Sequence, residues 1–299
     1  MNTAFLYITT VLIWGSTWYA ITLQLGVVDP VVSVAYRFAI AALILLAWCI
    51  TRGKDMRYSA RDHTWMALQG LFLFCANYAV FYVATGYVTS GLVAVVFSTI
   101  AAWNLLFARL LFGAPVGWRV PTGAALGICG LGLVFWHEVE ALNLRDDAAL
   151  GLLLCIIATV LASFGNMASA RNQQRGLPVL QTNAFGMAYG AAFTAAFAAW
   201  TGRAFVWDPS FDYLWSVLYL ALFGSVLAFG AYLTLLGRIG AGRAAYAAVL
   251  FPVVALSMSV VLEGYAFTPL AILGAALVLG GNILVLARAK HFSWLKKIA

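Results

Sequence analysis

The sequence predicts an all-α integral membrane protein, with ten transmembrane helices arranged as two inverted repeats of five. Three observations predict this fold: the composition, the recurrence of long apolar segments, and the return of glycine-rich patterns in the second half. Hydrophobic residues make up 64% of the 299 residues and charged residues only 9%, whereas an average soluble domain carries about 25% charged residues. A soluble fold could not bury so much apolar surface, but a lipid bilayer can surround it.

Apolar segments of spanning length follow one another along the chain. A transmembrane helix needs about 20 mostly apolar residues to cross roughly 30 Å of hydrocarbon. The expected spans lie at 4–25, 31–51, 64–84, 88–112, 121–137, 150–171, 179–200, 213–233, 242–262 and 267–287. The first span is too long for the apolar region of a signal peptide and follows no basic residue, so we expect it to remain as the first helix.

Glycine-rich patterns of the first half return in the second half. The segment 274–286 (GAALVLGGNILVL) resembles 123–135 (GAALGICGLGLVF), at an offset of 151 residues. We therefore expect a first five-helix repeat at 1–140, a second at 148–290 and a cytosolic tail at 291–299. Because five is odd, the second repeat enters the membrane from the opposite side. Inverted repeats of this kind are typical of transporters whose binding site lies near the midplane, between the repeats.

Basic residues are distributed unevenly between the two ends of the expected spans. With a cytosolic N-terminus, 14 of the 17 lysines and arginines fall at inner ends, two in outer loops and one, Arg37, inside the second span. Cytoplasmic loops of membrane proteins are enriched in Lys and Arg, so we expect both termini in the cytoplasm. The net charge of +7 is thus a topology signal, and no nucleic-acid partner is expected.

The first span carries an unusual centre. The stretch TTVLIWGSTWYAITLQ, Thr9 to Gln24, holds two tryptophans and several small residues where a plain anchor would hold Leu, Val and Ile. Trp14 and Trp18 are four residues apart and share one helix face. At mid-membrane an indole N–H needs a partner or a wet cavity, and Gly15 and Ser16 would let another helix approach closely. We expect this face to line a central cavity, with helix packing as the alternative.

Other polar and aromatic residues within the spans complete a candidate substrate site. An asparagine inside the membrane must face protein or water, and sites for organic solutes are mostly apolar with a few placed polar groups. The candidate substrate-binding residues are Trp14, Trp18, Asn77, Tyr78, Tyr82, Ser98, Trp103, Asn104, Ser163, Asn166, Tyr232 and Tyr246. Packing between helices is the alternative explanation for each of them.

Three residues are expected to act in gating or structure. Arg37 lies about 10 Å into the membrane at 1.5 Å per residue, and Glu263 ends the ninth span on the same outer side. We expect these two to pair and clamp an outer gate, with a snorkelling arginine as the alternative. Pro252 lies in mid-span, where it lacks an N–H and should kink the helix.

Signatures of catalysis, metal binding and cofactor binding are absent from the sequence. His63, His137 and His291 lie outside the expected spans, and the four cysteines are isolated from one another. The sequence contains no phosphate-binding glycine loop, nucleophile elbow or HExxH motif. We therefore expect a protein that is not an enzyme and that holds neither a metal nor a cofactor.

Several motifs, in this order and spacing, resemble those of a known family. They are IWGSTW at 13–18, YRFAIAAL at 36–43 and LFPVVALSMSVVLEG at 250–264. Together they resemble the EamA family of the drug/metabolite transporter superfamily, and the chain is most similar to its YddG-type exporters of aromatic amino acids. The resemblance implies a multi-pass protein of the bacterial inner membrane. The fourth span departs from the repeat, because Ala101 stands opposite Pro252 and Phe112 opposite Glu263.

The favoured function is secondary transport by alternating access, exporting aromatic amino acids and related amphipathic metabolites from the cytoplasm. An exchanger of phosphorylated or nucleotide sugars is one alternative, although it would need more intramembrane Lys or Arg than Arg37. A passive channel is another. The expected partners are a small-molecule substrate and the lipid bilayer, and the chain is expected to act as a monomer.

Overall fold

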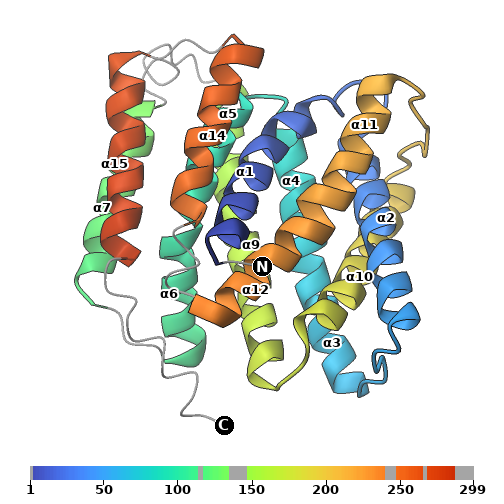
Figure 1. The fold of residues 1–299 in the computed structure, drawn as a ribbon. Helices are drawn as coiled ribbons and strands as arrows, with labels where there is room; N and C mark the ends of the chain where they lie inside the picture. The colour runs from blue at the N-terminus through green and yellow to red at the C-terminus, as the bar shows by residue number, and fades with distance from the viewer. Residues whose placement is uncertain (1–2, 114–116, 135–146, 240–246, 265–267, 287–299) are drawn as a thin grey trace.

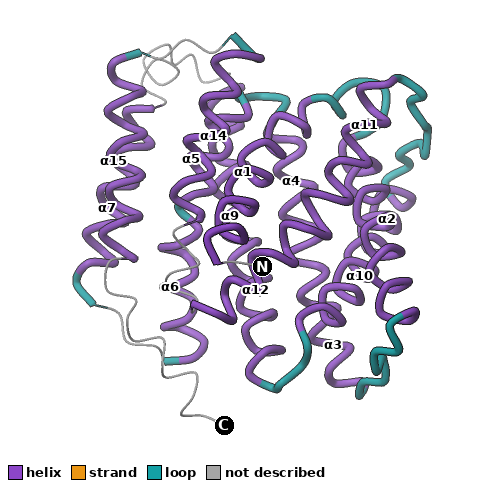
Figure 2. The backbone as a smooth tube through the Cα atoms, viewed as in Figure 1, coloured by secondary structure: helices purple, strands orange, loops and turns teal. Residues whose placement is uncertain are grey.

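The computed structural model describes residues 3–113, 117–134, 147–239, 247–264 and 268–286, and these residues form helices and no strands (Figures 1 and 2). The candidate residue Tyr246 and the expected tail at 291–299 lie outside the described residues. The absence of strands from the described part agrees with the predicted all-α class.

The helices follow one another as a series of rods that run along a common direction (Figure 1). Their bounds are α1 Thr3–Thr22, α2 Pro30–Thr51, α3 Ala60–Gln69, η1 Gly70–Ala76, α4 Asn77–Ala84, α5 Ser90–Ser98, α6 Ile100–Phe112, α7 Arg119–Val134, α9 Asp147–Gln174, α10 Val179–Trp200, α11 Phe211–Tyr219, η2 Leu220–Leu227, α12 Ala228–Ile239, α14 Ala247–Leu262 and α15 Pro269–Leu286.

Six helical stretches of the described chain are long and apolar enough to cross a membrane. They are Thr3–Thr22, Pro30–Thr51, Ala60–Ala84, Ser90–Phe112, Ala148–Gln174 and Phe211–Tyr232. Shorter apolar helices lie at Pro121–Val134, Leu250–Leu262 and Pro269–Leu284. These stretches support the prediction of an integral membrane protein.

The first two helices match their predicted spans to within a few residues, and local chemistry explains where the first ends and the second begins. The first helix ends at Thr22 rather than at residue 25, before a segment that includes Gly26 at φ 135°. A non-glycine residue rarely adopts that angle. The second helix begins at Pro30, because Asp29 accepts a hydrogen bond from the Val31 backbone N–H at 2.8 Å and Pro30 occupies the first turn.

Two helices contain a wide π-helical turn. One turn, η1, joins α3 to α4, and the other, η2, joins α11 to α12. In η2 the Ser225 hydroxyl donates to the Leu220 carbonyl, five residues back, at 3.0 Å. Such turns are rare and occur frequently at functional sites. The predicted spans 64–84 and 213–233 contain these two turns, and the hydrophobic pattern did not indicate them.

Helices α7 and α15 lie side by side at one edge of the molecule (Figure 1), and glycine makes their close approach possible. A Cβ added to Gly130 would lie 2.6 Å from the Gly274 carbonyl oxygen, and one added to Gly274 would lie 2.5 Å from the Gly130 carbonyl oxygen. Small residues let backbones approach in membrane helix pairs. The glycine pattern found in the sequence thus has a packing role in this pair.

The loops predicted as cytoplasmic and those predicted as outer lie at opposite ends of the helices. The loops at 52–59 and 175–178 lie at one end, and those at 23–29 and 201–210 lie at the other (Figure 2). Arg52, Lys54 and Arg175 belong to the first end, which we call the basic end. At the opposite end Arg203 forms an ion pair with Asp29.

Candidate functional site

A cavity of about 90 Å³ lies among the helices. This volume is several times what one water molecule needs. The cavity is lined by Trp14, Thr17, Trp18, Ile21, Leu73, Asn77, Tyr78, Phe81, Phe97, Ile100, Ala101, Asn104, Asn166, Ser169, Asn183, Phe229, Tyr232 and Phe251. Among these described lining residues none carries a formal charge, and most are aromatic or aliphatic.

Four aromatic rings from four helices meet on the cavity wall. Trp18 of α1 lies 5.2 Å from Phe81 of α4 and 5.3 Å from Phe97 of α5, measured between ring centroids. Phe251 of α14 lies 5.8 Å from Phe97 and 6.4 Å from Trp18. Aromatic pairs at such separations stabilise one another by about 0.5–1.5 kcal/mol beyond the area they bury. We call these four residues the aromatic cluster.

Polar side chains of α6 and α9 form a second group on the cavity wall. Asn104 of α6 accepts hydrogen bonds through its side-chain oxygen from the Ser163 hydroxyl at 2.8 Å and the Asn166 amide at 3.3 Å. Asn104 and Asn166 line the cavity, whereas Ser163 is buried behind them. Three residues that the sequence singled out on two different helices therefore form one hydrogen-bonded group.

Trp14 and Trp18, which share one face of α1, have different surroundings. The Trp14 indole N–H donates to the Gly224 carbonyl at 3.2 Å, and its ring lies 5.0 Å from that of Tyr232. The Trp18 indole nitrogen is buried and has no hydrogen-bond partner among the described residues. Gly15, between them, packs against Val254 of α14, as its small size predicted.

Asn77 provides a second unsatisfied polar atom on the cavity wall. The residue is 2% exposed, and within the described chain its side-chain oxygen accepts no hydrogen bond. A buried polar group without a partner costs about 1–3 kcal/mol. The Trp18 N–H and the Asn77 oxygen are thus a buried donor and a buried acceptor without partners among the described residues, on two side chains that line the cavity.

Three of the described candidates, Tyr82, Ser98 and Trp103, are not among the lining residues. Tyr82 is fully buried and accepts a hydrogen bond from Arg37 at 3.4 Å. Ser98 accepts one from Asn282 of α15 at 2.9 Å, and Trp103 stacks on Phe107 with ring centroids 6.0 Å apart. Each of the three thus has a packing contact in this structure.

The expected pair of Arg37 and Glu263 is wrong for this structure. Glu263 accepts hydrogen bonds from the Ser90 backbone N–H at 3.1 Å, from the Ser90 hydroxyl at 2.6 Å and from the Ser259 hydroxyl. Its carboxylate therefore caps the first turn of α5, where the helix dipole favours negative charge. Arg37 instead donates to Ser225 of η2 at 3.1 Å.

Several lining residues were missed in the sequence. Thr17 directly precedes Trp18 and Phe251 directly precedes Pro252, two residues that the sequence did single out. Phe229 lies at the start of α12, just after η2. Ser169 and Asn183 are polar residues of α9 and α10, so their polarity within apolar helices was a usable signal. The aliphatic and phenylalanine lining residues carry no signal that separates a cavity wall from ordinary packing.

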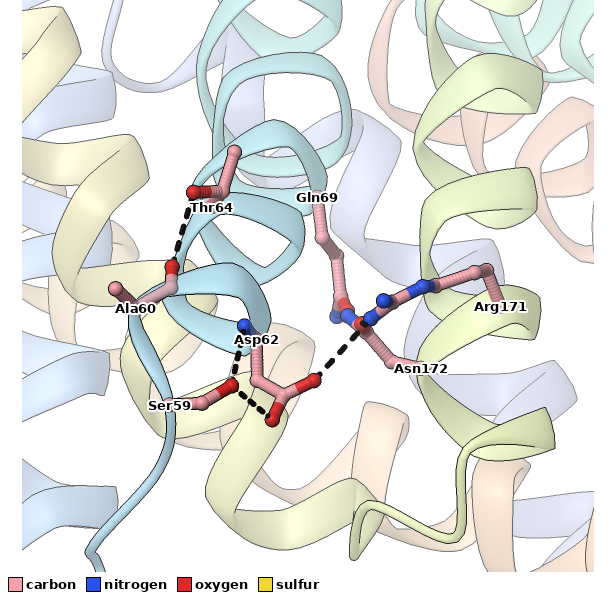
Figure 3. Close-up of polar contacts among 7 residues, drawn as sticks. All are labelled: Ser59, Ala60, Asp62, Thr64, Gln69, Arg171 and Asn172. Atoms are coloured by element: carbon pink, nitrogen blue, oxygen red, sulfur yellow. Dashed lines mark hydrogen bonds and ion pairs between the residues drawn. The ribbon is translucent and has the colours of Figure 1, made fainter.

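A hydrogen-bonded chain connects the cavity wall to the basic end. The Asn183 side-chain oxygen accepts from the Gln69 amide at 2.9 Å, and the Gln69 oxygen accepts from the Asn172 amide at 3.0 Å. Next to Asn172, Arg171 contacts Asp62 at 3.4 Å (Figure 3). The chain links three helices, α3, α9 and α10, and we call it the polar chain.

Comparison with known proteins identifies the family to which the chain belongs. The model of the EamA-like transporter family matches residues 1–136 and again residues 149–287. A solved crystal structure shares the fold with a TM-score of 0.70, at 20% identity and with 96% of this chain and 97% of its own length covered.

Curated relatives cover nearly the whole chain. An Escherichia coli protein named "Uncharacterized inner membrane transporter YedA" is 29% identical over 276 residues, which are 92% of this chain and 87% of the relative. Protein PagO of Salmonella typhimurium is 24% identical over 291 residues, 96% of this chain and 94% of the relative. A "Probable amino-acid metabolite efflux pump" of Escherichia coli is 26% identical over 286 residues, 92% of each chain.

Proposed function

We propose that this chain, which belongs to the EamA-like transporter family, exports aromatic amino acids and related amphipathic metabolites from the cytoplasm. Its family and the names of its relatives point to a multi-pass membrane transporter rather than an enzyme. The proposal places it in a bacterial inner membrane as a monomeric secondary transporter that works by alternating access. YddG-type specificity for aromatic amino acids is part of the proposal.

The observation that carries the proposal is the uncharged aromatic cavity with its two unsatisfied polar atoms. Trp14, Tyr78 and Tyr232 offer ring surfaces on its wall. The Trp18 N–H can donate to a carboxylate, and the Asn77 oxygen can accept from an ammonium group. An aromatic amino acid presents these three features together. The relative named as an amino-acid metabolite efflux pump supports the same class of substrate.

The proposed architecture is ten membrane crossings in two inverted repeats, 1–140 and 148–290. It is supported by the family model, which matches each half of the chain separately. It is also supported by the wide turns η1 and η2, which begin at Gly70 and Leu220 and occupy similar places in their helices. The cavity takes residues from both halves, as a site between two repeats should.

The proposed cycle opens the cavity alternately at its two ends. In the proposed cycle the aromatic cluster gates one end, while Glu263 links α5 to α14 through the hydroxyls of Ser90 and Ser259. Phe251 of the cluster directly precedes Pro252, which lies inside α14. A proline within a helix weakens it locally, so α14 could move its aromatic ring aside by bending there.

Two alternatives have less support. An exchanger of phosphorylated or nucleotide sugars would need cationic groups on the cavity wall, whereas the described lining is uncharged. A passive channel is less favoured because a site between inverted repeats is typical of transporters that work by alternating access.

Counterflow in proteoliposomes tests the proposal. Vesicles loaded with unlabelled phenylalanine should accumulate labelled phenylalanine transiently, and vesicles loaded with serine or glutamate should not. A channel would show equilibration without accumulation. The absence of any protein-dependent phenylalanine flux would reject the proposed substrate class.

A further inference from the structure

Arg37 is a buried positive charge without a negative partner among the described residues. Its side chain is 1% exposed. The ion pairs found in the described chain join Arg171 to Asp62 and Arg203 to Asp29, and Glu263 is engaged by Ser90 and Ser259. Arginine keeps its charge even when it is buried, so this position holds a fixed cation inside the protein.

Neutral groups stabilise this cation without cancelling it. The guanidinium donates to the Ser225 hydroxyl at 3.1 Å and to the Tyr82 hydroxyl at 3.4 Å. Its central carbon lies 4.6 Å from the ring centroid of Tyr78 and 5.1 Å from that of Phe38. Hydroxyl and cation–π contacts lower the energy of a buried cation, but they leave its net charge in place.

The wide turn η2 brings this charge close behind the cavity wall. A Cβ added to Gly224 would lie 3.2 Å from a terminal guanidinium nitrogen of Arg37 and 2.8 Å from the Thr17 methyl carbon. Thr17 lines the cavity, as does Tyr78, whose ring lies against the guanidinium. Arg37 is therefore separated from the cavity by a single layer of side chains.

We propose that Arg37 is the charge-selecting residue of the cavity, which favours substrates that carry a carboxylate and rejects organic cations of the same shape. The inference rests on the proposed function and deepens it by naming the charge of the substrate. Arg37 selects through its field across Tyr78 and Thr17, whereas the direct contacts fall to the Trp18 N–H and the Asn77 oxygen.

The size of the expected selection follows from the distance. A charged group packed on the cavity face of Tyr78 would lie about 8 Å from the guanidinium carbon, since atoms in contact are about 3.5–4 Å apart. Unit charges at that separation, with an effective dielectric constant of about 20, change an equilibrium constant by about thirtyfold. An anion and a cation of the same shape should differ by more than one order of magnitude.

Three ligands that share a phenyl ring test the inference on the purified full-length protein at pH 7. They are 3-phenylpropionate, an anion; phenylalanine, a zwitterion; and phenethylamine, a cation. Each competes with labelled phenylalanine for binding in detergent. We expect 3-phenylpropionate to compete at least tenfold better than phenethylamine. Equal competition by the two would overturn the inference while phenylalanine binding upheld the proposed function.

Variants show whether Arg37 is the source of the selection. R37Q should reduce the ratio of the apparent affinities for 3-phenylpropionate and phenethylamine at least tenfold. R37K keeps the positive charge and should keep most of this ratio. R203Q removes a positive charge at the end of the helices, outside the cavity lining, and should leave the ratio unchanged. An R37Q protein that binds phenylalanine with the wild-type ratio would overturn the inference.

If R37Q does not fold, the anion-to-cation affinity ratios of the wild-type protein and of R37K decide the inference. A preference for the cation in either protein would overturn the inference. No binding of labelled phenylalanine to the wild-type protein would reject the proposed function, and the inference with it.

Discussion

Trp14 and Gly224 are 210 residues apart in the sequence, and the indole N–H of the first donates to the backbone carbonyl of the second at 3.2 Å. The bond joins α1 of the first half to η2 of the second. One turn further along the same face of α1, the Trp18 indole N–H has no hydrogen-bond partner among the described residues. Two tryptophans that share one helix face therefore differ in the hydrogen bonding of their N–H groups.

Replacement of each tryptophan by phenylalanine should show the consequences of this difference. Trp14→Phe should lower the free energy of unfolding by about 0.5–1.5 kcal/mol, the usual contribution of one hydrogen bond. Trp18→Phe removes an N–H that has no partner, so stability should stay the same or rise, whereas affinity for phenylalanine should fall several-fold. Thermal unfolding in detergent and labelled phenylalanine binding measure the two effects. Equal loss of binding with unchanged stability in both variants would contradict this assignment.

Gly224→Ala should be one of the more damaging glycine substitutions in the chain. The added methyl group would meet the Thr17 methyl at 2.8 Å and the Arg37 guanidinium at 3.2 Å. Overpacking of this kind costs about 1–3 kcal/mol. Gly230→Ala is the matched control, because its added methyl group would meet nothing within 4 Å. Unfolding temperatures of the two variants should therefore differ, and identical values would show that η2 can shift to accept the methyl group.

Gln69 should matter more for stability than Asp62, although only Asp62 is charged. Gln69→Leu leaves the Asn172 amide N–H and the Asn183 side-chain oxygen, both buried, without their hydrogen-bond partner, at a cost of about 1–3 kcal/mol for each unsatisfied group. Asp62→Asn weakens a longer contact to Arg171, of a kind that contributes about 0–1 kcal/mol near a surface. Chemical denaturation of both variants checks the order. A larger effect of Asp62→Asn would mean that the polar chain is held by its charged end.

Single cysteines at the two ends of the helices test the proposed orientation. Lys54→Cys lies at the basic end, and Ala204→Cys lies in the loop at the opposite end, and both positions are exposed. Because basic loops remain in the cytoplasm, a membrane-impermeant thiol reagent applied to intact cells stripped of the outer membrane should label Ala204→Cys only. Lysis should expose Lys54→Cys as well. Labelling of Lys54→Cys alone in intact cells would mean that the protein has the opposite orientation in the membrane.

Much of the cavity could be predicted because polar and aromatic residues are unusual inside membrane helices. Trp14, Asn77, Asn104 and Asn166 all stood out for this reason, and all line the cavity. Ser98 stood out equally and instead bonds Asn282 of α15. The difference depends on which helices are neighbours and how each is rotated, and residue spacing along one helix does not contain that information.

The error over Arg37 and Glu263 has a related cause. Depth along the helix axis placed both residues toward the same membrane face, and depth can be read from the sequence. The direction in which each side chain points around its helix axis cannot be read from the sequence. In the structure Arg37 faces η2, whereas Glu263 faces the first turn of α5. The π-helical geometry of η2, which lets Ser225 meet the guanidinium, also has no signature in the hydrophobic pattern.

The central claim is that the aromatic wall of the cavity selects the substrate, and competition for labelled phenylalanine uptake into proteoliposomes tests it most directly. Two or three ring contacts of about 0.5–1.5 kcal/mol each should favour aromatic amino acids by one to two orders of magnitude. We expect tryptophan and tyrosine to compete strongly and serine not to compete. Tyr78→Ala should reduce this difference, whereas Trp200→Ala, at an exposed position outside the cavity lining, should leave it unchanged. Serine competing as well as tryptophan, or Tyr78→Ala leaving the ranking intact, would contradict it.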